Sequence, residues 1–246
     1  MNKRTFIRGF GYTAAVPTAL PIPLPNQDRR DSARYTIPEA AAYIAVPERT
    51  MRSWFRGDHR LFRPTYERGS SVFLSFFDVT EAYVIETLRT HWEFKPRKLR
   101  KIVKFLRKTT GNNRPLLRQL GVIKEFQALV IPSRQKGKIV HTDIAGDENL
   151  VFEDFVKTLA VRIKRDSKGK PVLLYPGDST IEDSLPVSMD PDVMSGELVV
   201  TGTRIPVARI MANYTAGQSA DQIADSYGLG RDLIRKVILH FEPEET

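Results

Sequence analysis

The side chains of this chain with the clearest chemistry are Lys and Arg, which pair with anions. Ten of them lie between His91 and Leu120 against one acid, Glu93, an excess of +9 that equals the formal net charge of all 246 residues. Clustered positive charge of this kind is expected where a protein binds a phosphate backbone. The plain alternative is a solvated helix face.

A second candidate is the single arginine in the stretch "GELVVTGTRIPVARIMANYTAG". We expect short extended segments at Leu198–Thr201 and Ile205–Val207, joined by a corner in which Gly202 takes a positive φ. The guanidinium of Arg204 is suited to pair with carboxylates of a partner. The alternative is that Arg204 braces its own corner, with Thr203 capping the next turn.

Other chemistries have little support in the sequence. There is no cysteine and the four histidines are scattered, so we predict no metal site. No nucleophile elbow, phosphate loop or catalytic carboxylate motif is present, so we predict neither an enzyme nor a cofactor. No apolar run is long enough to span a bilayer. Prolines interrupt the amino-terminal apolar stretch, and we expect a flexible tail over residues 1–33 on a cytoplasmic protein.

The elements that must position the basic residues begin with two short helices. "TIPE" is a capping box formed by Thr36 and Glu39, and it predicts a helix over about 38–44. A turn and a second helix over about 48–56 follow, with Met51, Trp54 and Phe55 facing the core. Such a pair has the outline of a helix-turn-helix.

A hairpin and two longer helices come next. The "ERGSS" turn between extended stretches predicts a small wing, and we expect Asp78 to cap the following helix. In the basic helix, about 96–108, apolar residues recur at helical spacing and predict one buried face opposite the Lys and Arg. Those residues are Leu99, Ile102, Val103 and Leu106. Beyond it we expect strands around Gly137 and a helix leading into a hairpin at Gly169.

The carboxy-terminal part reads as a bundle of three helices after a short extended segment. Its first helix is expected at about 208–214, and Ser219 with Gln222 forms a second capping box. From Gly177 to Glu197 there are six acids and no Lys or Arg, which marks a domain boundary. We therefore predict an α+β protein, mainly α, with four parts. They are a tail (1–33), a DNA-binding domain with a β-rich extension (34–177), an acidic linker (178–189) and a docking domain (190–246).

The segment "DPDVMSGELVVTGTRIPVARIMANYTAGQSADQIADSYGL" resembles the domain of unknown function numbered 433, found in VapB-like antitoxins. The shared features are Asp190-Pro191, the run Gly202 to Val207, Gly217-Gln218-Ser219, Ile223-Ala224 and Tyr227-Gly228-Leu229. Glu197-Leu198 departs from the Lys-Pro or Arg-Pro usual in the family. "YTIPEAAAYIAVPERTMRSWFRG" and "LSFFDVTEAYVIETLR" resemble the MerR-like helix-turn-helix domain of longer members.

This resemblance implies an antitoxin that neutralises a PIN-like nuclease toxin and represses its own operon by binding operator DNA, as a homodimer or a larger assembly with the toxin. We expect toxin contacts at Gly202, Thr203, Arg204, Ile205 and Pro206. The expected DNA contacts are Arg49, Thr50, Arg52, Ser53, Arg56, Arg63, Tyr66, Arg68, Lys98, Lys101 and Lys108. The alternative is a stand-alone MerR-like transcription regulator. In a two-headed form, Arg231, Arg235 and Lys236 would also read DNA.

Overall fold

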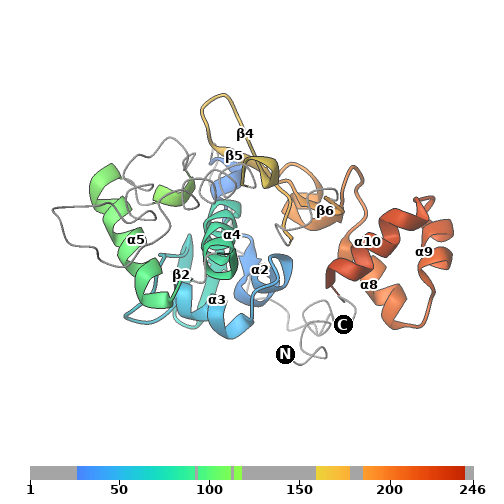
Figure 1. Cartoon of the computed structure of the whole chain (residues 1–246), viewed down its shortest axis with the longest axis horizontal. Coiled ribbons are helices and arrows are strands. Elements are labelled where there is room, and N and C mark those ends of the chain that lie inside the picture. Colours follow the sequence, from blue (N-terminus) through green and yellow to red (C-terminus); the bar gives the residue numbers. More distant parts are fainter. Residues whose placement is uncertain (1–26, 92–93, 112–113, 118–158, 178–184, 242–246) are drawn as a thin grey trace, which may run out of the picture.

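The computed structural model describes residues 27–91, 94–111, 114–117, 159–177 and 185–241, and it is an α+β protein as predicted. In Figure 1 the helices α2 to α5 lie at one end of the molecule, α8 to α10 lie at the other, and β4 to β6 lie between them. Two small antiparallel sheets have the strand orders β1-β3-β2 and β4-β5-β6-β7. The expected strands around Gly137 lie outside the described residues.

The amino-terminal end contains a short strand, two helices and a hairpin. The predicted capping box begins α2, with the Thr36 N–H donating to Glu39 Oε2 at 2.8 Å and the Glu39 N–H donating to Thr36 Oγ1 at 3.3 Å. Met51, Trp54 and Phe55 of α3 are buried, as expected from their spacing. The elements are β1 (Tyr35–Thr36), α2 (Ile37–Tyr43), α3 (Glu48–Phe55), β2 (Tyr66–Arg68) and β3 (Ser71–Leu74).

Helix α4 (Phe76–His91) runs through the middle of this end, and the prediction of its cap was wrong. Ser75, not Asp78, is the capping residue: its Oγ accepts from the Asp78 N–H at 3.2 Å, while Asp78 Oδ2 accepts from the Ser75 N–H at 3.0 Å. Asp78 is thus the third helical residue of a capping box. Asp78 and Glu81 are also three residues apart, as in a capping box. The sequence alone therefore placed the start of the helix about one turn too late.

Helix α5 (Pro96–Thr110) has the two faces predicted for it. Its four apolar residues are at most 2% exposed, whereas the Lys and Arg opposite them are largely exposed. Gly111 ends the helix with a φ of 62°, the left-handed conformation that glycine adopts readily. A 3-10 turn, η2 (Pro115–Leu117), packs against both α4 and α5.

The second sheet joins segments that the sequence analysis placed in different parts. Its strands are β4 (Ile163–Arg165), β5 (Pro171–Leu174), β6 (Val187–Met189) and β7 (Leu198–Val200). Gly169 turns the β4–β5 hairpin at a φ of 75°, as expected. Strand β6 occupies the last residues of the predicted linker, and Leu174 of β5 pairs with Met189 of β6. The predicted domain boundaries stay predictions, but the sheet continues across this one.

The carboxy-terminal helices are α8 (Val207–Thr215), α9 (Ala220–Tyr227) and α10 (Arg231–Phe241). The Ser219–Gln222 capping box is present, with bonds of 2.8 and 3.2 Å. The strand expected at Ile205–Val207 is absent, because Pro206 already caps α8 and only an isolated bridge pairs it with Val199. Proline lacks the N–H that a continued strand would need. Ile234, Val237, Ile238 and Phe241 of α10 are buried as predicted.

A polar network lies at the centre of the amino-terminal end. Asp78 is 1% exposed and accepts hydrogen bonds from the Thr65 hydroxyl at 2.6 Å and from the backbone N–H groups of Thr65 and Ser75. Arg114 forms an ion pair with Asp78 at 3.0 Å and another with Asp31. A buried carboxylate needs such partners, because leaving it unpaired costs several kcal/mol.

Glu81, one turn further along α4, is a buried carboxyl with weaker support. Burial, and after it the nearby charge of Asp78, raise its pKa to about 8 against the opposing effect of Arg114. The Leu116 N–H donates to Glu81 Oε1 at 3.2 Å. The folded protein therefore holds a proton here that the unfolded chain releases near its ordinary pKa of 4.5.

We expect this proton to make stability fall as pH rises. Between about pH 5 and pH 8 the folded state binds more protons at Glu81 than the unfolded state, so the free energy of unfolding decreases. Glu81→Gln mimics the protonated acid, so its advantage over the wild type should grow by about 3 kcal/mol across this range. Urea denaturation of both proteins at several pH values measures the difference. Parallel curves would show that Glu81 is already ionised in the fold.

Candidate nucleic-acid interface and docking corner

The predicted DNA contacts on α3 lie on one exposed side of that helix. Arg49, Arg52 and Ser53 are exposed and Thr50 is half-buried. Arg52 pairs with Glu48 one turn before it, and the Ser53 hydroxyl donates to the Thr50 carbonyl at 2.8 Å. An exposed pair of this kind contributes little stability. Among these residues, Arg49 has a side chain that makes no hydrogen bond with any described residue.

Arg56, another predicted contact, has a structural role that the sequence did not reveal. Its Nη2 donates to the carbonyls of Gly69 and Ser70, at 3.3 and 3.0 Å, in the turn between β2 and β3. Arg60 adds a second tie, an ion pair of 2.6 Å with Glu67. The hairpin is therefore held against the end of α3.

Arg68 of the hairpin is exposed to solvent, as is Arg63 in the loop before β2. Tyr66 is half-buried, with its ring 6.1 Å from that of Phe73. The two arginines and Arg49 of α3 are thus accessible, whereas Tyr66 mainly packs on the sheet.

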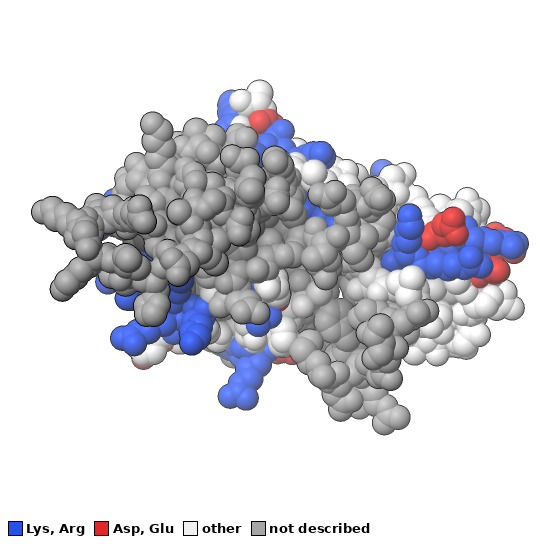
Figure 2. Space-filling model, in the orientation of Figure 1, with Lys and Arg blue, Asp and Glu red and all other residues white. Residues whose placement is uncertain are grey.

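Helix α5 continues the basic surface. Lys98, Lys101 and Lys108 are exposed, and the first and last are separated by about 15 Å along the helix axis at 1.5 Å per residue. Lys98 Nζ lies 3.7 Å from the centroid of the Phe94 ring. Arg100 Nε donates to the carbonyl of His59 at 3.3 Å and so ties α5 to the loop after α3. Figure 2 shows Lys and Arg gathered on the side of the molecule that carries α3 and the start of α5.

The Gly-Thr-Arg corner after β7 is built by Thr203. Its hydroxyl donates to the Val200 carbonyl at 2.9 Å and accepts from the Ile205 N–H at 3.0 Å, and Gly202 has a φ of 77°. Ile205 and Pro206 are half-buried. Arg204 is exposed and makes no hydrogen bond or ion pair with a described residue. Thr203 thus braces the corner, and Arg204 does not.

The cations of α10 have acidic neighbours. Arg235 pairs with Asp221 of α9 at 2.9 Å, and Arg231 lies 3.5 Å from Asp225. Lys236 is exposed. Figure 2 shows blue and red side chains interleaved at this end, unlike the largely blue side of α3 and α5.

A cleft that the sequence analysis did not anticipate lies beside the corner. It has a volume of about 690 Å³ and is formed by residues 27–34 together with the loop 191–197 and Arg204. Arg29 and Arg34 lie in it, although residues up to 33 were expected to form a tail. No local signal could have found it, because its walls are more than 150 residues apart in the chain.

Among the residues that the structure describes, no group of three His, Cys, Asp or Glu is placed to hold a metal ion. No helix there is long and apolar enough to cross a membrane.

One comparison with known proteins concerns the Gly-Thr-Arg corner and the three carboxy-terminal helices. Residues 187–239 match the family described as "Protein of unknown function (DUF433)". The DUF433 segment begins at β6 and ends in α10, so it contains the corner, β7 and nearly all of the three helices. It covers most of the domain that the sequence analysis predicted for docking, and it leaves the amino-terminal end unassigned.

A solved structure shares the arrangement beyond the DUF433 segment. The X-ray crystal structure of Rv2018 from Mycobacterium tuberculosis aligns with a TM-score of 0.60 and 22% identity, covering 86% of this chain and 100% of that chain. The likeness shows that the two proteins share a fold. No curated protein matches the chain significantly.

Proposed function

We propose that this protein is an operator-binding antitoxin, in which the amino-terminal end binds DNA as a winged, MerR-like helix-turn-helix and the DUF433 segment docks a PIN-like nuclease toxin. The observation that carries the DNA-binding half is the set of exposed cations on α3, the hairpin and α5. Arg56 ties the end of α3 to the hairpin turn, and Arg100 ties α5 to the loop after α3, both through backbone carbonyls. A helix and a wing held in fixed relation are what a groove and its flanking phosphates require.

The Gly-Thr-Arg corner supports the second half of the proposal, the docking of a toxin by the DUF433 segment. Thr203 holds the backbone, so the unpaired Arg204 projects from a rigid support. Because the backbone is already ordered, only the rotamers of the Arg204 side chain must be fixed when its guanidinium meets a carboxylate. PIN-like nucleases hold their metal ions with clustered carboxylates, which are matching partners for Arg204.

The alternative, a regulator with two DNA-binding heads, is less well supported. The arginines of α10 are already paired with Asp221 and Asp225. Those carboxylates would repel a phosphate backbone approaching α10. We therefore assign DNA to the amino-terminal end and a protein partner to the DUF433 segment.

Co-purification of the full chain with the product of the adjacent gene tests the docking half. We expect a stable complex with the wild type and its loss with Arg204→Glu, because the reversed charge repels the partner's carboxylates. Arg209→Glu is the matched control, since Arg209 is exposed on α8 and makes the same charge change. Light scattering of the complex would give the number of copies of each protein. If the protein is a homodimer, as proposed, the number of copies of this chain is even. A complex that survives Arg204→Glu unchanged would refute the role of the corner.

A further inference from the structure

The cleft beside the corner brings together the first described residues and the loop before β7. One wall is the segment that contains the 3-10 turn η1 (Arg29–Asp31), and the other is the loop with η4 (Met194–Gly196). Arg204 closes the cleft from the corner. Two hydrogen bonds to backbone carbonyls of the loop help to hold the walls together: Arg34 Nη1 donates to the Ser195 carbonyl at 2.8 Å, and the Tyr35 hydroxyl donates to the Gly196 carbonyl at 3.0 Å.

Arg34 is held in place but not fully satisfied. Its backbone N–H donates to the Leu74 carbonyl at 2.8 Å, and its side chain is fixed by the bond to Ser195. Its Nε is buried and has no hydrogen-bond partner among the described residues. Leaving a buried charged donor without an acceptor is costly, and Arg34 is one of the residues that line the cleft.

The charges that line the cleft indicate which kind of chemical group it would bind. Three arginines and two acids face it, which leaves a net charge of +1. Arg29 is partly neutralised by Asp192, 3.4 Å away. The guanidiniums of Arg34 and Arg204 therefore remain for a ligand, and Glu197 stands close enough to disfavour a doubly charged one.

The loop opposite Arg34 is strained. Met194 and Ser195 have φ values of 45° and 58°, a conformation that costs residues other than glycine roughly 1 kcal/mol or more each. The bonds from Arg34 and Tyr35 hold this loop in place. Backbone strain that is offset by contacts across a cleft is typical of a preorganised binding site.

We propose that this cleft binds a single carboxylate group between the guanidiniums of Arg34 and Arg204. The guanidinium of Arg34 donates from the wall of the cleft, and that of Arg204 donates from its rim. The source of the carboxylate is an Asp or Glu side chain of the docked partner, and only this assignment of the source rests on the proposed function. The docking surface then includes residues 27–34 as well as the DUF433 segment.

The test uses the full chain and a peptide with one carboxylate, acetyl-Gly-Glu-Gly-amide, at constant ionic strength set with chloride. The readout is the Nε–H signal of Arg34 in a proton–nitrogen correlation spectrum, assigned by its disappearance in Arg34→Lys. We expect a saturable shift with the Glu peptide and none with acetyl-Gly-Gln-Gly-amide. Arg204→Gln should weaken binding at least about tenfold, whereas Arg209→Gln should leave it unchanged.

Three results would overturn the proposal. They are a signal that does not saturate, equal shifts with the Gln peptide, and equal affinity in Arg204→Gln and the wild type. Inorganic phosphate is the competing ligand, and tighter binding of phosphate than of the Glu peptide would assign the site to a dianion instead. No partner protein is present in this experiment, so its outcome is independent of toxin docking. If the peptide binds but no toxin co-purifies, the carboxylate site stands and only the proposed source of the carboxylate is refuted.

Discussion

A variant carrying Arg49→Gln, Arg52→Gln and Lys101→Gln is expected to bind its own promoter duplex about 100-fold more weakly than the wild type. The three residues are exposed on α3 and α5, the two helices of the basic surface. Each phosphate contact that is lost also removes a released counterion. The slope of log affinity against log salt should therefore fall in magnitude by about 0.9 per contact. Fluorescence anisotropy between about 50 and 200 mM salt measures both quantities.

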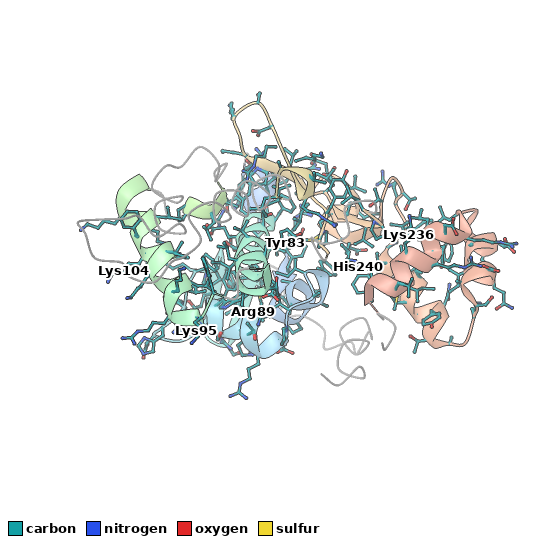
Figure 3. All side chains as sticks on the ribbon, in the orientation of Figure 1. Tyr83, Arg89, Lys95, Lys104, Lys236 and His240 are labelled. Carbon is teal, nitrogen blue, oxygen red and sulfur yellow. The ribbon has the colours of Figure 1, made fainter. Side chains whose placement is uncertain are left out.

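The control removes the same charge from the opposite end. Arg231→Gln, Arg235→Gln and Lys236→Gln together also lower the net charge by three, but they lie on α10. Figure 3 shows Lys95 and Lys104 of the basic surface at one end of the molecule and Lys236 at the other. We expect this variant to keep wild-type affinity and salt slope. Equal losses in the two variants would favour the two-headed regulator or a purely non-specific attraction.

Gly196→Ala is expected to destabilise the protein by about 3 kcal/mol or more. Gly196 has a φ of 83°, and a Cβ added there would lie 2.1 Å from the hydroxyl of Tyr35. Tyr35 is 4% exposed and its hydroxyl is bonded to the Gly196 carbonyl, so it has little room to move. Urea denaturation followed by circular dichroism measures the change.

Two variants separate strain from collision. Gly202→Ala has a nearly equal φ of 77° but nothing within 4 Å of the added Cβ, so we expect a cost of only about 1 kcal/mol. Tyr35→Phe removes the colliding oxygen, and combined with Gly196→Ala it should be more stable than Gly196→Ala alone. Equal destabilisation by Gly196→Ala and Gly202→Ala would mean that the contact between Tyr35 and Gly196 does not hold the two ends together.

The helices and their caps were predictable because their signals are local. Apolar residues three and four apart, as in α5 and α10, select one buried face, and the capping boxes of α2 and α9 need only residues three apart. The same locality explains the error at α4. Asp78 and Glu81 have capping-box spacing, but both are buried, one with Arg114 as a partner and one protonated.

The candidate site divides in the same way. The sequence alone determined which segments carry exposed cations, since helical spacing separates them from the core, and it placed the positive φ of Gly202 in the Gly-Thr-Arg corner. Tertiary structure decided how those cations are used. Arg56 meets the hairpin turn, Arg204 stays unpaired, and Arg34 and Tyr35 bond to partners 161 residues away. Contacts over such a separation depend on packing of the whole chain, which leaves no periodic pattern in the sequence.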